Sequence, residues 1–433
     1  MRSAILSLNV AIAGAVCSPC YEKPPACTGS ETSVQITGVT GDFCSPLCVQ
    51  NQCPKGDGSF TAKPSCVLET QGSSKPTQCA LICTPGANGA CPTGSTCQAI
   101  QGEGICTYPS SAADAVAKTT ASFVSDAAKP LMDLELIATV NQDATSTWTA
   151  GVNDRFVGVS LGNAREMMNA RADGIDLLPA VLHSLEEIAA TPSSYDPRND
   201  TARAHCTGPI LDQGFCGSCW AFGATEAISD RVCMANGNAT GGYVGLAPLD
   251  LTSCDDGLFS MESGCQGGQL MGAWNYAKKT GLVEETAYPY LKSQGGPVPT
   301  CDPNAQPCLP ESKFIKTPKC SKPATATKHK ISSVYSVPAS SLKTELFTNG
   351  PVESAFTVYA DFPAYKSGVY VHKTGAELGG HAIKIIGYGT EGGQAYWLVQ
   401  NSWTTTWGNG GYFKIATTGD NGGISDQAVA GKV

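Results

Sequence analysis

The first hydrophobic pattern in the chain lies near its N-terminus. Residues Ala4–Val16 are apolar apart from Ser7 and Asn9, and they follow the basic residue Arg2. Together with the small residues that end at Ala15, this pattern is typical of a secretory signal peptide covering residues 1–15. The run is too short to cross a bilayer, and no later run reaches roughly 18 apolar residues, so we expect no membrane span.

A second pattern runs between Asn163 and Ala190, where apolar residues recur at helical spacing. The residues concerned are Met167, Met168, Ile175, Leu178, Val181, Leu182, Leu185 and Ile188. They predict a helix within an Ala-rich stretch, residues 110–190, that contains no cysteine. We interpret this stretch as a separable segment.

The third pattern belongs to residues 191–433 and combines the apolar spacing of helices with the apolar runs of strands. An apolar stripe from Trp220 onward, with Phe222, Ala227, Ile228 and Val232, predicts a helix. Apolar strands are predicted in HAIKIIGYG, which begins at His381, and in YWLVQ, which ends just before Asn401. This stretch is therefore expected to have an α+β fold and is long enough for two lobes.

Composition narrows the class of protein. With 433 residues, we expect two or three domains of roughly 100–200 residues each. A charged fraction of 15%, with 48 Gly and 27 Pro, is typical of a loop-rich globular protein and not of a disordered one. The formal net charge of −9 argues against nucleic acid or an anionic membrane surface as the main partner.

The chain contains 21 cysteines, which indicates an oxidising compartment. Twelve lie between Cys17 and Cys106, and nine between Cys206 and Cys320. An odd count in the second group leaves one thiol there without a partner. Residues 16–109 form a Cys-rich module that depends on disulfides, while zinc binding at Cys17 and Cys20 is the alternative, weakened because residues 16–109 contain no histidine.

The candidate chemistry centres on CGSC, from Cys216 to Cys219, placed where the predicted helix begins. The positive end of a helix dipole favours a thiolate there. A redox pair and a plain structural disulfide are the alternatives, although the short segment before the motif does not fit a thioredoxin-like strand.

A thiolate nucleophile requires a base and a group that orients the base. Of the five histidines, His381 opens a predicted strand after two glycines, and Asn401 ends another strand beside aromatic residues. The Asn401 side chain could accept the second ring proton of His381, and Trp403 and Trp407 could shield that hydrogen bond from water. Taken singly, these residues could be core or turn residues.

The segments CGSCWAFG, CQGG, GGHAI and NSWTTTWGNGGYF resemble the papain-like cysteine peptidases. The segments EAISDRVC and NGPVESAFTVYADFPAYKSGVYVH are similar to cathepsin B in particular, and the similarity covers residues 191–433. It implies a papain-like two-lobed fold, with the nucleophile helix in a helical lobe and the His and Asn residues in a β-barrel-like lobe. A disulfide-rich module and a helical prosegment would precede it.

The resemblance assigns a role to each matching residue. Cys219 would be the nucleophile, with a thiol pKa of roughly 3–4 as in papain, and His381 its acid/base partner. Asn401 would orient His381, and Gln213 would donate to the oxyanion together with the backbone N–H of Cys219. It implies no cofactor and no metal.

The same resemblance implies the substrate contacts. The backbone of Gly267 and Gly268 would pair with the substrate, and Trp403 would border the leaving-group side. The main specificity pocket would be lined by Leu270, Ala355 and Ala382, with Gln427 at its floor. Cathepsin B has an acidic residue at that floor, so a neutral Gln427 favours hydrophobic P2 residues over arginine.

One loop departs from the cathepsin B pattern. Residues 291–328, up to Lys328, contain no histidine, whereas cathepsin B uses paired histidines there to bind a substrate carboxylate. We therefore expect an endopeptidase with little dipeptidyl carboxypeptidase activity. The implied disulfides are Cys206–Cys233, Cys216–Cys265, Cys254–Cys320 and Cys301–Cys308.

The remaining expectations concern the surroundings of the enzyme. Residues 110–190 would be an inhibitory prosegment that is cleaved near Ala190–Ser193, with a plain linker as the alternative. Cystatin-type proteins are further candidate inhibitors. Sequons at Asn199 and Asn238 fit a glycoprotein of the secretory pathway, found in a lysosome, a vacuole or the extracellular space. The Cys-rich module could bind protein or glycan, and we expect a monomer. The alternative function is a non-catalytic adhesion or matrix protein.

Overall fold

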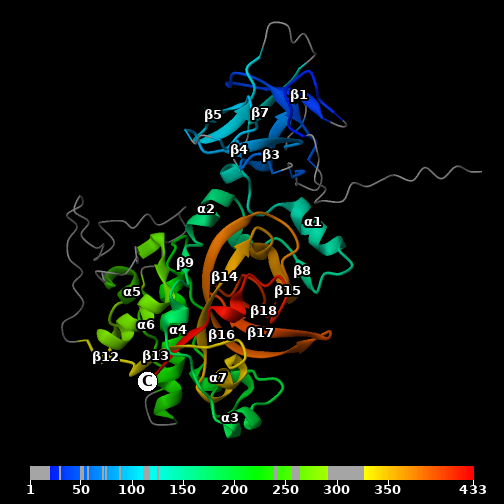
Figure 1. Ribbon diagram of the computed structural model, residues 1–433. Helices are drawn as coiled ribbons and strands as arrows, with labels where there is room; N and C mark the ends of the chain where they lie inside the picture. Colours follow the sequence, from blue (N-terminus) through cyan, green and yellow to red (C-terminus); the bar gives the residue numbers. More distant parts are fainter. Residues whose placement is uncertain are drawn as a thin grey trace, which may run out of the picture. The chain divides into compact units, whose positions relative to one another are not determined.

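The computed structural model describes residues 20–28, 31–48, 53–55, 58–70, 73, 76–86, 89–110, 118–123, 126–237, 242–255, 264–290 and 326–433. The chain divides into two compact units, Met1–Lys129 and Pro130–Val433 (Figure 1). Among the described residues, no helix has the length and apolar character needed to cross a bilayer.

The first unit contains a seven-stranded sheet in the order β2-β1-β7-β3-β4-β6-β5. Its strands are β1 Thr32–Ile36, β2 Phe43–Ser45, β3 Lys63–Thr70, β4 Gln78–Cys83, β5 Thr96–Ile100, β6 Glu103–Thr107 and β7 Thr119–Phe123. A short 3-10 helix, η1 Asp126–Ala128, follows. Five disulfides join described residues of this unit: Cys27–Cys44, Cys48–Cys66, Cys53–Cys79, Cys83–Cys97 and Cys91–Cys106. Cys20 is also disulfide-bonded, so it offers no free thiolate for zinc.

Strand β7 changes the boundary expected at residue 109. It pairs in parallel with β1 and antiparallel with β3, so the sheet extends to Phe123. Ala121 and Phe123 are buried while Ser122 between them is exposed. This is the period-2 pattern of a half-buried strand, which the Ala-rich composition around it concealed.

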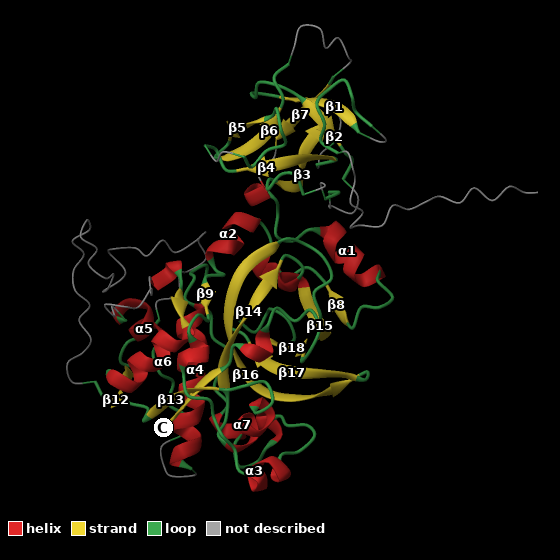
Figure 2. Cartoon of the chain, in the orientation of Figure 1, coloured by secondary structure: helices red, strands yellow, loops and turns green. Residues whose placement is uncertain are grey.

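The second unit is built on an eight-stranded sheet in the order β13-β19-β14-β16-β17-β18-β15-β8, which curls on itself (Figure 2). Its strands are β8 Trp148–Ala150, β13 Ser333–Ser336, β14 Val352–Tyr359, β15 Tyr365–Tyr370, β16 Glu377–Glu391, β17 Gln394–Gln400, β18 Tyr412–Ala416 and β19 Val429–Lys432. Two small ribbons pair β9 Ala170–Arg171 with β10 Gly268–Gln269, and β11 Leu282–Val283 with β12 Lys328–His329.

The helices of this unit are α1 Leu134–Gln142, α2 Leu161–Glu166, α3 Leu185–Ala190, α4 Cys219–Asn236, α5 Pro248–Cys254, α6 Leu270–Lys279 and α7 Leu342–Thr348. Helices α5 and α6 pack against α4, which in turn packs on β14 and β16. The expected α+β fold with a helical lobe and a curled-sheet lobe is therefore confirmed.

Helix α4 is buried all round, not along one stripe as its apolar pattern suggested. Every side chain from Cys219 to Cys233 is buried. Two of its charged residues are paired: Asp230 lies 2.7 Å from Lys384, and Arg231 lies 2.7 Å from Glu345. Such pairs make up for the loss of water that burial imposes on a charge.

The single helix predicted over 163–190 is wrong. The chain forms α2, then β9, a 3-10 turn η3 Ile175–Leu177, and finally α3. Gly174 has a φ of 79°, which breaks any helix at that point. Met167 and Ile175 are buried, whereas Leu182 is 92% exposed, so the helical spacing arose from residues in several separate elements.

Two of the implied disulfides are present in the structure, Cys206–Cys233 and Cys216–Cys265. The other two implied pairings, Cys254–Cys320 and Cys301–Cys308, include residues outside the described part of the chain. The same applies to the signal peptide at 1–15, to most of the loop 291–328 and to the sequon at Asn238. Asn199 ends the 3-10 helix η4 Pro197–Asn199 and is exposed.

Candidate active site

Four predicted residues come together where α4 meets the curled sheet. Cys219 is the first residue of α4, and His381 lies on β16, against which α4 packs. Asn401 directly follows β17, the antiparallel neighbour of β16. Its side-chain oxygen lies 2.8 Å from His381 Nε2. The sheet register thus brings two residues that are distant in the sequence into hydrogen-bond contact.

The imidazole of His381 is held from several sides. Its ring stacks on Trp403 with centroids 4.7 Å apart, and Phe356 presents an edge at 6.0 Å. The backbone N–H of Ser402 donates to Asn401 Oδ1 at 2.8 Å, which fixes the amide. The other ring nitrogen, Nδ1, is buried and has no hydrogen-bond partner. The ring is therefore oriented with one nitrogen free to exchange a proton.

Gln213 lies in the loop before α4 and is buried. Its side-chain oxygen accepts from Ser402 Oγ at 2.7 Å, so its nitrogen faces the opposite direction. That nitrogen donates to the carbonyl oxygens of Cys216 at 2.8 Å and Met167 at 3.4 Å. The Cys219 thiol donates to the same Met167 oxygen at 3.7 Å. A peptide carbonyl of the upstream segment is thus held by both Gln213 and Cys219.

We call residues 130–190 the upstream segment, and its part from Phe156 to Arg171 occupies the site. Phe156 packs edge-on against Trp403 with centroids 5.1 Å apart. Beyond Met167, Asn169 forms a β-bridge to Gly380, and β9 pairs in parallel with β10 at Gly268. The segment therefore passes Trp403 first, then Cys219, then Gly268.

The glycines at this site allow the upstream segment to approach closely. A Cβ built on Gly267 would lie 2.2 Å from the carbonyl oxygen of Asn169, and one on Gly380 would lie 2.2 Å from that of Ala170. A Cβ on Gly268 would meet the Trp220 ring at 2.4 Å. Larger side chains at Gly267 or Gly380 would thus block a strand from lying in the cleft, whereas one at Gly268 would collide with Trp220.

The pKa values of the central pair differ from the sequence-based expectation. Burial raises the pKa of the Cys219 thiol to about 11, although the backbone N–H groups of Ala382 and Trp220 counteract this. Burial also lowers the pKa of His381 to about 4, while its hydrogen bond to Asn401 works in the opposite direction. The expected thiol pKa of roughly 3–4 is wrong for this form, because the upstream segment excludes the water that would stabilise charge.

The predicted pocket residues lie on adjoining elements. Ala355 on β14 and Ala382 on β16 are cross-strand partners, and both are buried. Leu270 begins α6 and is fully buried, whereas Gln427 is half-buried after η8 Ile424–Asp426. Tyr290 stands outside any motif of the sequence, yet its hydroxyl lies 3.0 Å from Ser218 Oγ and donates to the carbonyl oxygen of Gln213 at 3.2 Å.

The disulfide Cys216–Cys265 decides between the interpretations of CGSC. Cys216 bonds to a residue outside the motif, and Cys219 is the free cysteine of the described part of the chain. A redox pair within the motif is therefore excluded.

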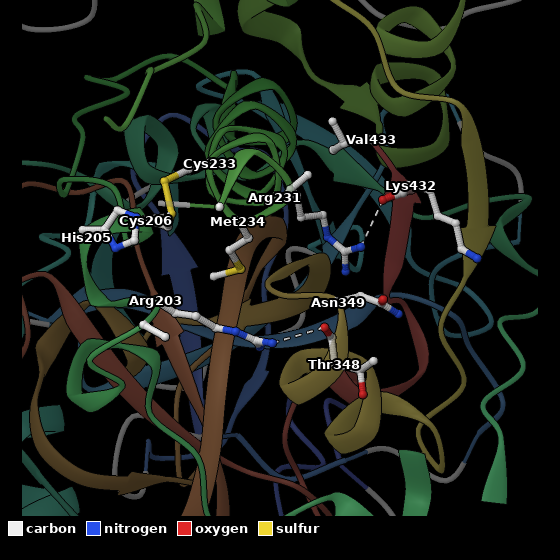
Figure 3. Close-up of a pocket in the computed structure, with 14 residues that line it drawn as sticks. Arg203, His205, Cys206, Arg231, Cys233, Met234, Thr348, Asn349, Lys432 and Val433 are labelled. Atoms are coloured by element: carbon white, nitrogen blue, oxygen red, sulfur yellow. Dashed lines mark hydrogen bonds between the residues drawn. A yellow bond between two sulfur atoms is a disulfide. The ribbon is translucent and has the colours of Figure 1, made fainter. Parts of the chain in front are cut away.

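A separate cavity of about 560 Å³ lies at the other end of α4 (Figure 3). Its lining includes Arg203, Arg231 and the disulfide Cys206–Cys233. Both arginines are already engaged, Arg231 with Glu345 and Arg203 with the carbonyl oxygen of Thr348. None of the predicted site residues lines this cavity.

Comparison with known proteins agrees with this geometry. Residues 191–432 match the family described as papain family cysteine protease. The chain is 43% identical over 249 residues to cathepsin B of Dictyostelium discoideum, covering 55% of this chain and 74% of that protein. It is 37% identical over 322 residues to a cathepsin B-like cysteine proteinase of Schistosoma japonicum, covering 70% and 92% respectively.

A solved structure extends the similarity to the upstream segment. The chain superposes on procathepsin B S9 of Trypanosoma congolense with a TM-score of 0.59 and 29% identity, covering 70% of this chain and 99% of that one. That neighbour is a precursor form, and the covered 70% of this chain is more than residues 191–433 alone amount to. The chain therefore belongs to the papain family of cysteine proteases, as a cathepsin B-like zymogen.

Proposed function

We propose that this zymogen yields a cysteine endopeptidase in which Cys219 is the nucleophile and His381 its acid/base partner. The observation that carries the proposal is the Met167 carbonyl oxygen, which both the Cys219 thiol and Gln213 Nε2 contact. A scissile carbonyl placed there would meet the nucleophile and an oxyanion donor together.

The reaction follows from these contacts. The Cys219 thiol gives its proton to His381 and its sulfur attacks the peptide carbonyl carbon, while Gln213 stabilises the oxygen as it becomes negative. His381 gives its proton to the leaving amine, and Asn401 keeps the ring in line through its 2.8 Å contact. Water, activated by the same imidazole, then hydrolyses the thioester and restores the thiol.

The upstream segment is proposed to be the inhibitory prosegment of this enzyme. A substrate would place its leaving-group side at Trp403 and its acyl side at Gly268, so that its chain runs from Gly268 toward Trp403. The upstream segment runs in the opposite direction, because Phe156 contacts Trp403 while Ala170, later in the chain, pairs with Gly268. A carbonyl presented in this reversed direction resists cleavage.

Maturation is proposed to occur in the secretory pathway, with cleavage near Ala190–Ser193. Helix α3 ends at Ala190, and Ser193 is exposed, so a peptidase can reach this connection. Acidification would loosen the prosegment in a lysosome, a vacuole or an acidic extracellular setting. The mature enzyme would be residues 191–433. The further partners that we propose are protein substrates, cystatin-type inhibitors and a protein or glycan ligand of the Cys-rich module.

The endopeptidase assignment predicts no preference for a free substrate carboxylate. The test uses two peptides that differ only in a free or an amidated C-terminus and that have a cleavable bond two residues from that end. Their kcat/KM values should agree within about 3-fold, because residues 291–328 supply no histidine to bind the carboxylate. Liquid chromatography of the products measures both rates. A strong preference for the free acid would contradict the endopeptidase assignment.

The P2 preference depends on Gln427, which is proposed to form the pocket floor near the apolar Leu270 and Ala355. Gln427→Glu should raise the kcat/KM ratio of an Arg-P2 to a Phe-P2 substrate by about 10-fold, since a carboxylate would pair with the guanidinium. Fluorogenic dipeptide substrates measure the ratio. The matched control is Gln394→Glu at the start of β17, which should leave it unchanged.

The alternative of a non-catalytic adhesion or matrix protein predicts that no processing conditions give peptidase activity. Two observations favour the enzyme: Cys219 and Gln213 contact the same Met167 carbonyl oxygen, and His381 contacts Asn401. An epoxide inhibitor of papain-like enzymes should label Cys219 after acid treatment, and peptide mass mapping locates the label. Absence of any label would support the alternative.

A further inference from the structure

Arg155 of the upstream segment contacts Asp212, Gly214 and Phe215 of the enzyme, and we call these three residues the cradle. Its Nη1 lies 2.7 Å from Asp212 Oδ1, and its Nη2 donates to the carbonyl oxygen of Gly214 at 2.9 Å. The Arg155 side chain is 8% exposed. The two nitrogens of one guanidinium therefore meet two acceptors that are two residues apart in the same loop.

The cradle also has an aromatic wall and a fixed carboxylate. The guanidinium carbon lies 5.5 Å from the centre of the Phe215 ring, within the range of a cation–π contact. The backbone N–H of Gly214 donates to Asp212 Oδ1 at 2.9 Å, which holds the carboxylate in place without help from Arg155. Within the described residues, Arg155 is the cation paired with Asp212.

This cradle lies beside the reacting groups. Asp212 immediately precedes Gln213 and forms a β-bridge to Trp403. The residue after Arg155, Phe156, packs on the same Trp403. The cradle therefore borders the leaving-group side of the proposed cleft.

When the prosegment leaves, Arg155 leaves with it and Asp212 loses its partner. We infer that Asp212, the Gly214 carbonyl and Phe215 then form a subsite that selects substrates with an arginine side chain on the leaving-group side of the cleaved bond. Arginine is favoured over lysine, because its planar fork satisfies both acceptors at once and lies flat against the ring. This inference rests on the proposed function and names a substrate class for it.

The test compares substrates on the mature enzyme. Internally quenched peptides carry arginine, lysine or the neutral isostere citrulline at one of the three positions after the cleaved bond. At the position that reaches the cradle, kcat/KM for arginine should exceed that for citrulline by about 10-fold, with lysine between them. In Asp212→Asn the ratio of arginine to citrulline should fall to about 1.

The matched control is Asp200→Asn. Asp200 has the same 28% exposure as Asp212, accepts a backbone N–H two residues on at 2.9 Å, and lies 4.0 Å from an arginine, Arg203. This variant should keep the wild-type ratio. Loss of the ratio in Asp200→Asn, or its retention in Asp212→Asn, would overturn the subsite.

A second measurement needs no variant enzyme. A synthetic peptide of residues 150–171 should inhibit the wild-type enzyme about 10-fold more strongly than the same peptide with citrulline at position 155. Equal inhibition by the two peptides, or equal kcat/KM values for the arginine and citrulline substrates, would overturn the arginine subsite. Hydrolysis of those substrates would still support the peptidase activity. Hydrolysis of neither substrate would instead refute the proposed function.

Discussion

Replacing Cys219 with serine is expected to lower kcat/KM for peptide hydrolysis by about 10⁴-fold or more. A serine hydroxyl is far less acidic than a thiol, so the proton transfer to His381 that prepares the nucleophile becomes unfavourable. Because the precursor could no longer process itself, the variant is matured with an added protease that is then removed. A fluorogenic peptide assay measures the residual rate.

The loss should arise from chemistry and not from unfolding. The Cys219 thiol donates a hydrogen bond to the carbonyl oxygen of Met167, and a serine hydroxyl of similar size can make the same contact. The six tryptophans all lie between Trp148 and Trp407, so their fluorescence reports the second unit alone. An unchanged thermal midpoint together with more than 1% residual activity would contradict the role of Cys219.

The second large effect concerns the reactivity of the same thiol before and after maturation. With a pKa of about 11, the buried thiol of the zymogen is ionised in about one molecule in 10⁵ at pH 6. In the mature enzyme, a papain-like pKa of roughly 3–4 leaves it almost fully ionised at that pH. Because the thiolate is the reactive form, alkylation by iodoacetamide should be at least about 10³-fold slower in the intact zymogen.

The sign of the pH dependence separates the two forms. Between pH 6 and 9 the zymogen rate should rise by about 10-fold per pH unit, since the thiolate fraction grows until pH reaches the pKa. The rate of the mature enzyme should stay nearly constant over this range. Intact-mass spectrometry measures the zymogen's labelling rate on uncut chains alone. The Cys219→Ser zymogen shows how much label reaches other residues. Equal rates in the two forms at pH 6 would contradict the proposal.

The roles of Cys219, His381 and Asn401 could be proposed from sequence because each stands in a motif with a recognisable local pattern. The start of α4 at Cys219 followed from the apolar stripe and the small residues before it. By contrast, the spacing between Asn163 and Ala190 predicted one helix where the chain forms four short elements. Apolar spacing alone does not show which side chains are buried: Met167, Met168 and Ile175 lie in the core, whereas Leu182, Leu185 and Ile188 are exposed.

The sequence by itself determined the reactive residue types, their order along the chain, and the odd cysteine that remains unpaired as Cys219. The tertiary structure decided what occupies the cleft, the raised thiol pKa and the pairing of Arg155 with Asp212. The physical reason is how far apart along the sequence the interacting residues lie. Helix starts, turns and strand periods depend on neighbouring residues, whereas desolvation and ion pairing depend on which distant segments fold against each other.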